Sequence, residues 1–231
     1  MILTPIPREA LAGVLERFAA GLHEPCALSF FEEIRATAPD RATAPEAEEH
    51  RLTALDFARH CGMAVHPAGT ECRFNWDGTA LNGDTEAYVI LHEIAHFVQA
   101  PPERWQLIDF GLGPGPDTLD REAAERAAVL TPLERDEDEA AASLLGILWE
   151  ARLGQPALAS FLDQNWLEGL ERSAAAHFMR VIAGLRDRGL LAFDPRRMLA
   201  LDCRSNFAVE DRGKQHAFRD GALPPRDQLV Q

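Results

Sequence analysis

The sequence predicts an α+β fold that is predominantly helical and consists of one domain with a small sheet. Most of its regular segments place apolar residues at helical spacing, and Gly or Pro residues mark the ends of several of them. One segment, 70–78, instead alternates apolar and polar residues and ends in a glycine turn, as a strand does. The 231 residues show no break in composition, so we expect a single domain over residues 1–231.

The N-terminal part is expected to hold two helices separated by a loop. Residues 8–22 carry apolar side chains at helical spacing, which predicts a helix with one buried face. Residues 35–49 repeat the string RATAP and contain several prolines, so they are expected to form a flexible, solvated loop. A short helix should then cover residues 51–60 and close at Gly62.

The rest of the chain predicts a series of helices. Asp84 or Thr85 can cap a helix that runs through Gln99 and stops before Pro101. Further helical patterns cover residues 120–130, 136–153, 157–170 and 173–188. Residues 203–231 are polar and contain prolines, and their pattern indicates no regular element.

The charge balance points away from nucleic acid and membranes. The chain has 37 Asp plus Glu residues against 23 Lys plus Arg, for a formal net charge of −14. Such a surface repels phosphates and anionic lipids but attracts a basic protein or peptide. No signal segment or membrane-spanning run is evident, and the four cysteines form no CxxC pair. We therefore expect a cytoplasmic protein with reduced thiols.

The string LHEIAH carries the clearest chemical signal. On a helix, His92 and His96 lie one turn apart on the same face, so both imidazoles can bind one metal ion. Glu93 borders the same site and can act as a general base or can hydrogen-bond to metal-bound water. This arrangement predicts a helix of the zincin-like HExxH type.

A third protein ligand has to come from elsewhere in the chain. A third histidine six residues after the second would indicate a metzincin, but Gln99 and Pro102 occupy the corresponding positions. The acidic start of the helix at 136–153 offers Glu137 or Glu139 instead. These two point about 200° apart around a helix, so only one can face the metal, and periodicity leaves both open. Small residues in line with Glu139 would allow close packing on the motif helix.

The motif and the residues after it resemble the elongation factor P hydroxylase family of bacteria. The resemblance covers LHEIAH followed directly by FVQAPPERWQLIDFG, and its matching positions are His92, Glu93, Ile94, His96, Ala100, Arg104, Leu107, Asp109, Phe110 and Gly111. The family has a glutamate that opens a downstream helix, and counting back from Gly154 matches it to Glu139. The resemblance thus implies that Glu139 is the third ligand, and a weaker match is QNWLEG at 164–169.

Two histidines and one carboxylate suit an Fe(II) oxygenase, and the same set binds zinc in hydrolases. The resemblance implies an iron-dependent hydroxylase that acts on a protein lysine, with elongation factor P or another basic protein as partner. Glu93 would then handle protons, and Asp109 would orient a ligand or substrate, or would only brace its loop.

Two alternatives stay open. In a zinc peptidase, Glu93 would deprotonate the bound water, and Tyr88, His177 or Arg180 would have to stabilise the oxyanion. The second alternative is a metal-binding protein without catalytic turnover.

Overall fold

The computed structural model describes residues 6–116, 118–167, 173–192 and 194–199. Within these ranges the chain is mostly helical, and no regular strand is formed. The α-helices are α1 (Arg8–Ala20), α2 (Pro25–Arg35), α3 (Ala44–His60), α4 (Ala87–Gln99), α5 (Arg121–Ala127), α6 (Pro132–Leu153), α7 (Ala157–Asp163) and α8 (Ala174–Asp187). Three short 3-10 helices are η1 (Pro102–Arg104), η2 (Ile108–Gly111) and η3 (Leu190–Ala192). The prediction of a predominantly helical chain is confirmed.

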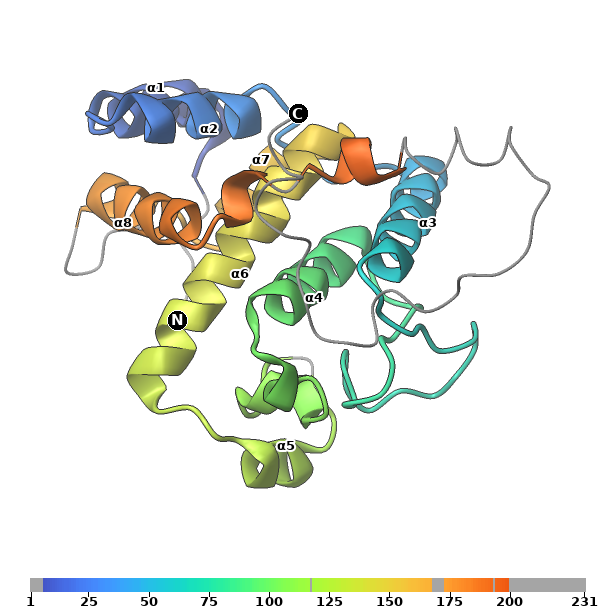
Figure 1. The fold of residues 1–231 in the computed structure, drawn as a ribbon. Coiled ribbons are helices and arrows are strands. Elements are labelled where there is room, and N and C mark those ends of the chain that lie inside the picture. The colour runs from blue at the N-terminus through green and yellow to red at the C-terminus, as the bar shows by residue number, and fades with distance from the viewer. Residues whose placement is uncertain (1–5, 117, 168–172, 193, 200–231) are drawn as a thin grey trace, which may run out of the picture.

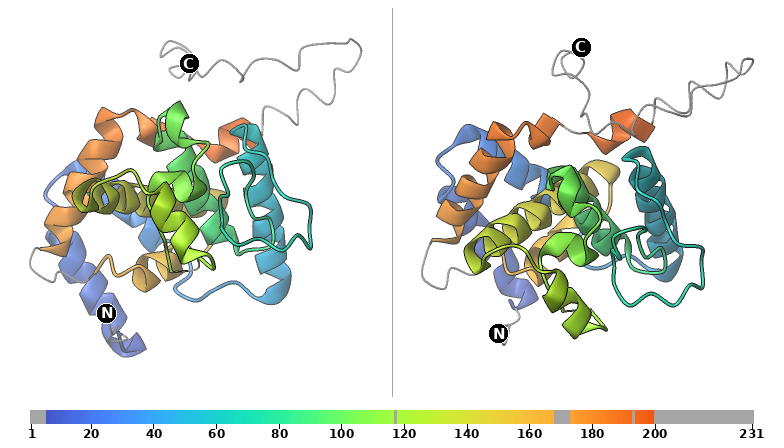
Figure 2. Two further views of the ribbon diagram at one scale, coloured as in Figure 1. Left: turned by 90° about the horizontal axis from the view of Figure 1, so that it is seen from below. Right: turned by 60° about the horizontal axis from the view of Figure 1, so that its bottom comes forward.

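Helix α6 is the central element of the fold. It is 22 residues long and packs most extensively against α4, with further contacts to α2, α7 and α8. Helix α3 packs on α4 as well, so α4 lies between α3 and α6 (Figure 1). The two other views show the same order, with α1 and α8 on the far side of α6 from α3 (Figure 2). The motif helix is thus enclosed between two long neighbours.

One hydrophobic core joins α1 to α4 with α6 to α8. Its aromatic centre is a group of four fully or nearly buried phenylalanines whose ring centroids lie 4.8–6.3 Å apart: Phe18, Phe31, Phe161 and Phe178. Trp149 of α6 is fully buried and meets Phe57 of α3 edge to face. Each such side chain buries a large apolar area, so this cluster fixes α6 in place.

The predicted strand over residues 70–78 is wrong. Two isolated bridges, Val65 with Leu81 and Trp76 with Leu81, are the only β-type pairings among the described residues. The predicted turn does form, because Asp77 accepts hydrogen bonds from the backbone of the two residues after Gly78. A Cβ at Gly78 would lie 2.5 Å from the carbonyl oxygen of Gln106, so this turn packs directly on another loop instead of pairing with a strand.

The predicted flexible loop at 35–49 is only partly correct. Helix α3 already begins at Ala44, where Thr43 and Glu46 form a reciprocal capping box. The repeated proline, Pro45, lies in the first turn, where its missing N–H costs nothing. Arg41 of the preceding segment is also anchored, because its guanidinium donates hydrogen bonds to Ser160 and Asp163 of α7.

Several helix ends differ from those expected. Glu86, not Asp84 or Thr85, is the N-cap residue of α4, although the helix does end at Gln99 as predicted. Helix α6 starts four residues earlier than expected, because Thr131 caps it. Helix α7 ends at Asp163 rather than continuing to 170. Residues 168–170 and the tail at 203–231 lie outside the described residues.

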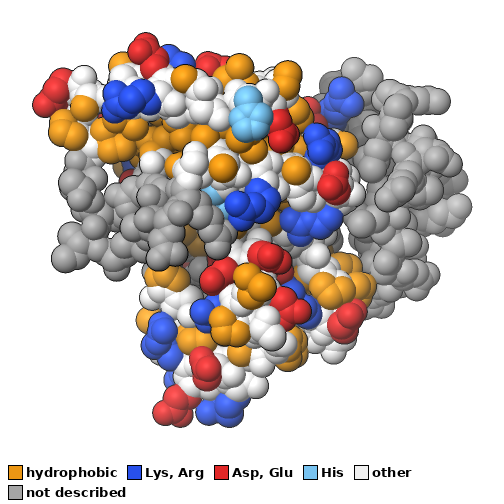
Figure 3. Space-filling view, turned by 90° about the vertical axis from the view of Figure 1, so that its left-hand side faces the viewer, with side chains coloured by type: hydrophobic (Ala, Val, Ile, Leu, Met, Phe, Trp, Pro, Cys, Tyr) orange, Lys and Arg blue, Asp and Glu red, His pale blue; other side chains and the backbone are white. Residues whose placement is uncertain are grey.

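The described surface mixes charges of both signs. On the face drawn in Figure 3, acidic, basic and apolar side chains are interspersed rather than gathered by sign. Among the described residues, four large apolar side chains are exposed: Leu52, Leu119, Val129 and Leu133. No helix among the described residues is long and apolar enough to cross a bilayer.

Candidate metal centre

A glycine on α6 allows α4 to approach closely at the motif. A Cβ at Gly146 would lie 3.3 Å from both the backbone nitrogen and the Cα of His92. That spacing is tight even for a methyl group, so the two helix backbones are nearly in contact. Ala142, one turn earlier on α6, is fully buried, whereas Ser143 bonds Gln164 and Trp166 on another side. The expectation of close packing through small residues is therefore met at Gly146.

This packing brings together the three side chains that the sequence analysis identified as candidate metal ligands, those of His92, His96 and Glu139. The Nε2 atoms of His92 and His96 lie 3.0 Å apart. The Oε2 atom of Glu139 lies 3.2 Å from the former nitrogen and 3.5 Å from the latter. His96 is buried, whereas the side chains of His92 and Glu139 are 23% and 45% exposed. The cluster is thus closed on the His96 side and reachable from solvent on the other.

These three atoms fit one first-row divalent metal ion. A circle through points with the three observed separations has a radius of about 1.9 Å, close to the metal–nitrogen and metal–oxygen distances of about 2.0–2.2 Å. His92, His96 and Glu139 could therefore hold one such ion together. With three protein ligands, such an ion would keep coordination positions open for water or substrate.

Asp138 orients His96 from behind. The Nδ1–H of His96 donates to Oδ1 of Asp138 over 2.8 Å. With that proton on Nδ1, the neutral ring directs the lone pair of Nε2 at the cluster, which is the tautomer that a metal ligand requires. Carboxylate partners of this kind are a common feature of metal-binding histidines. Sequence reasoning considered the glutamates on either side of Asp138 and missed this residue.

Asp138 is itself held by two further donor groups, the Gln99 amide and the Arg104 guanidinium. The Nε2 group of Gln99 donates to its carboxylate and to its backbone carbonyl, over 2.8 and 3.0 Å. Arg104 NH2 donates to the other carboxylate oxygen over 2.8 Å, and Arg188 at the end of α8 donates to Gln99 Oε1 over 3.0 Å. Asp138 therefore has little freedom to rotate, and the same is true of the His96 ring bound to it.

Charges within the cluster are strongly coupled. Burial favours a neutral Glu139, but hydrogen bonds from His92 and His96 outweigh it and hold the pKa of Glu139 well below its usual range. Burial likewise opposes a charged His96, yet hydrogen bonds to Asp138 and Glu139 raise the pKa of His96 to about 10. The pocket therefore favours one positive charge between these acceptors, which either a proton or a metal cation can supply.

Glu93 lies beside the cluster and is buried. It is 7% exposed, and its carboxylate has no hydrogen-bond partner among the described residues. Burial raises the pKa of Glu93, and the charges of His96 and His92 lower it in part. A carboxyl group in this state can hold or release a proton near the metal position.

Asp109 borders the same cluster from a strained turn. Asp109 and Phe110 both adopt left-handed backbone conformations, with φ values of 45° and 52°. The backbone N–H of Asp109 donates to the Trp76 carbonyl over 2.9 Å, and the Thr118 hydroxyl donates to its carboxylate over 3.1 Å. Burial raises the pKa of Asp109 to about 6. The charge of His96 lowers this pKa, and the charge of Glu139 raises it.

Phe110 forms an apolar wall behind His96. Its ring is fully buried and stacks on Trp76 with centroids 5.3 Å apart and an interplanar angle of 7°. The His96 ring lies on Phe110 with centroids 5.9 Å apart. Trp105 stacks on Phe97 and donates its indole N–H to backbone carbonyls of α4, so it packs as core. These rings exclude water from the inner side of the cluster.

The other candidate residues are not part of the group formed by His92, His96 and Glu139. Glu137 is exposed and does not meet the histidines, so Glu139 is the glutamate that the packing of α6 selects. The ring of Tyr88 lies under the guanidinium of Arg41, and His177 stacks on Trp166. Arg180 is exposed on α8.

Comparisons with protein-family models, with curated proteins and with solved structures found no match for this chain. The likeness to elongation factor P hydroxylases therefore rests on the motif residues alone.

Proposed function

We propose that the protein is a metal-dependent enzyme, and specifically an iron(II)-dependent hydroxylase. The observation that carries this proposal is the convergence of two imidazole nitrogens and one carboxylate oxygen within 3.5 Å of one another. Two histidines and one carboxylate on one side of an ion are the ligand set of non-heme iron(II) oxygenases. Iron(II) bound there would supply the activation of dioxygen.

The surrounding residues have separate tasks in this proposal. Asp138 keeps His96 in the ligand tautomer, and Glu139 contributes the negative charge that a divalent cation requires. Glu93 and Asp109 are the two carboxyl groups that can exchange a proton with a bound substrate, because burial raises the pKa of each. The partly exposed side, at His92 and Glu139, is where a substrate would enter.

The substrate class follows from the family resemblance and from charge. The resemblance suggests a lysine of a protein such as elongation factor P. The formal net charge of −14 favours a basic partner over an acidic one. Hydroxylation with dioxygen also consumes two electrons, so an external reductant has to take part.

One observation favours a second candidate, a zinc-dependent peptidase or other hydrolase. Glu93 is buried beside the cluster, where it can deprotonate a metal-bound water. Such an enzyme also needs a group that stabilises the oxyanion. Tyr88 and His177 are engaged with Arg41 and Trp166, and Arg180 is exposed on α8, which argues against all three in that role and favours the hydroxylase.

The test compares iron and zinc in one preparation. Metal-depleted protein is reloaded without oxygen with either iron(II) or zinc, and is then given air, ascorbate and a lysine-containing basic peptide. The proposal predicts oxygen uptake and addition of one oxygen atom to the peptide with iron alone. The exposed variant Glu137→Gln should match the wild type, while His92→Ala should be inactive. Peptide cleavage by the zinc form, without oxygen uptake by the iron form, would instead establish the hydrolase.

A further inference from the structure

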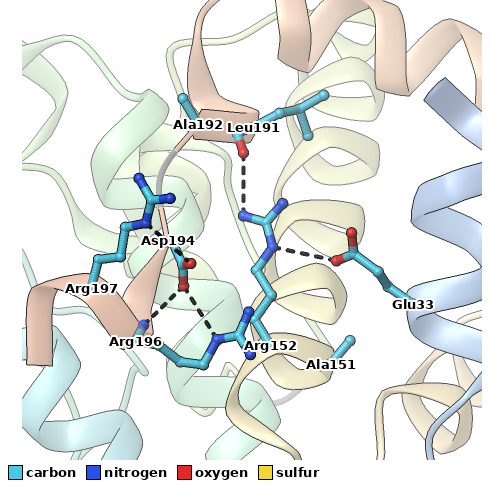
Figure 4. A pocket seen from close by; sticks show the side chains of 8 residues that line it. All are labelled: Glu33, Ala151, Arg152, Leu191, Ala192, Asp194, Arg196 and Arg197. Carbon is cyan, nitrogen blue, oxygen red and sulfur yellow. Dashed lines mark hydrogen bonds and ion pairs between the residues drawn. The ribbon is translucent and has the colours of Figure 1, made fainter. Parts of the chain in front are cut away.

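A cavity lies far from the cluster of His92, His96 and Glu139, at the other end of α6. Its volume is about 640 Å³, within the range of about 300–1,000 Å³ that is common for small-molecule sites. Its lining comes from the end of α6, from α2, from η3 and from residues 194–197 (Figure 4). Arg152 on α6 is 13 residues after Glu139, which places it about 20 Å further along the helix.

Arginines dominate the charge of this cavity. Arg152, Arg196 and Arg197 line it together with two carboxylates, those of Glu33 and Asp194. The lining therefore carries one net positive charge, although the whole chain has a formal net charge of −14. A local excess of cations inside a concave surface of an acidic protein concentrates anions there.

Arg152 is held firmly at the wall of the cavity. Its side chain is 11% exposed, and its Nε lies 3.5 Å from an oxygen of Glu33. Its NH1 group donates to the carbonyl oxygen of Leu191 over 3.2 Å, and its guanidinium lies over the ring of Phe30. These contacts come from α2 and η3, so the guanidinium is oriented in advance of any ligand.

Asp194 orients the other two arginines while leaving their outer ends available. One carboxylate oxygen of Asp194 lies 3.6 Å from Nε of Arg196, and the other lies 3.9 Å from Nε of Arg197. The first oxygen also accepts the backbone N–H of Arg196 over 3.0 Å. The terminal nitrogens of Arg196 and Arg197 have no hydrogen bond within the described part of the chain (Figure 4). Such paired N–H groups match the oxygens of a phosphate or a carboxylate.

We propose that the cavity lined by Arg152, Arg196 and Arg197 is a binding site for a compact divalent anion, either a phosphate group or a dicarboxylate. The site is independent of the proposed metal chemistry, because none of its residues contacts the cluster of His92, His96 and Glu139 in the described structure.

The experiment is calorimetric titration of the full chain with inorganic phosphate and, separately, with succinate, at constant ionic strength in chloride. We expect saturable binding of at least one of the two anions, and the tighter of them identifies the class. The double variant Arg196→Gln/Arg197→Gln should weaken binding by about tenfold or more, because each lost arginine removes charge-assisted hydrogen bonds. Both side chains are more than 60% exposed, so this variant should keep the fold.

Two controls make the result specific. Arg186→Gln removes an exposed arginine of α8 that lies outside the cavity, and it should bind the anion as the wild type does. His92→Ala should also bind normally, so a failure of the metal proposal leaves this result unaffected. The proposal is overturned if neither anion shows saturable binding, or if the double variant binds as tightly as Arg186→Gln.

Discussion

Nδ1 of His96 and Oδ1 of Asp138 are joined by a hydrogen bond of 2.8 Å that crosses from α4 to α6. Asp138 precedes Glu139, so one turn of α6 supplies both the carboxylate beside the Nε2 atoms and the carboxylate behind His96. Arg104 and Gln99 fix Asp138 in turn. Metal binding should therefore depend on a residue that never touches the metal.

Asp138→Asn tests this dependence. The amide removes the negative charge that stabilises the His96 tautomer and the Arg104 guanidinium, so metal affinity should fall about 10–100-fold. Competition with a chromogenic chelator measures the affinity, and circular dichroism checks the fold. Glu137→Gln, one residue away and exposed, is the matched control. Equal affinity of the two variants would remove Asp138 from the account.

The choice between the two glutamates of α6 has its own test. Glu139→Gln keeps the size of the side chain but removes the charge beside both Nε2 atoms, so stoichiometric metal retention should be lost. Glu137→Gln should retain metal as the wild type does, because that side chain is exposed and outside the cluster. Metal content after desalting decides the matter, and loss only in Glu137→Gln would reverse the assignment.

Gly146→Ala should disturb the site through the backbone. The added Cβ would lie 3.3 Å from two backbone atoms of His92, and α4 would have to move by a few tenths of an ångström. We expect a loss of about 1–3 kcal/mol in the free energy of unfolding, together with weaker metal binding.

Gly184→Ala on α8 is the matched control for that substitution. A Cβ at Gly184 meets no atom within 4 Å, so the change should stabilise the protein by about 0.5–1 kcal/mol through helix propensity. Urea denaturation compares the two. If Gly146→Ala is as stable as Gly184→Ala, the contact of α4 with α6 is looser than described.

Glu150 should make stability depend on pH. It is 2% exposed in the core, where Ser160 donates to it, and burial raises its pKa from 4.5 to about 8. Between these values the folded state binds a proton that the unfolded state has lost. The contribution of Glu150 to the free energy of unfolding is therefore largest below about pH 4.5. It falls by up to about 1.4 kcal/mol per pH unit as the pH rises towards 8.

Glu150→Gln mimics the neutral form and should reduce this fall, so that the variant is more stable than the wild type at pH 8. Glu49→Gln, an exposed substitution on α3, should follow the wild type. Parallel stability curves of wild type and Glu150→Gln over this range would contradict the buried, protonated state.

The elements that could be predicted are those with strong local signals. Helix α4 ends at Gln99 as expected, because apolar periodicity and Pro101 both act within a few residues. Helix α6 is capped at its end by Gly154, which adopts the left-handed conformation that glycine favours at a helix C-terminus, so this end too follows from a local signal. The predicted strand at 70–78 failed because alternation reports only a half-buried surface. Here Asp77 and the loop at Gln106 supply the partners that a second strand would otherwise provide.

The candidate site was predictable in its histidines but not in its surroundings. Helical spacing alone pairs His92 with His96. The choice of Glu139 over Glu137 depends on where α4 lies against α6, which Gly146 and the aromatic core determine over long sequence separations. The left-handed turn at Asp109 and Phe110 depends in part on a residue far away in the sequence, since the carbonyl of Trp76 and stacking on its ring help to hold it.

The most direct test of the central claim is the metal content of protein purified without oxygen from cells supplied with both iron and zinc, combined with the spectrum of its nitric oxide adduct. The account predicts stoichiometric iron and an adduct signal, both lost in Glu139→Gln and both kept in Glu137→Gln. Wild-type protein that retains no metal would contradict it, and so would metal retention that is unchanged in Glu139→Gln.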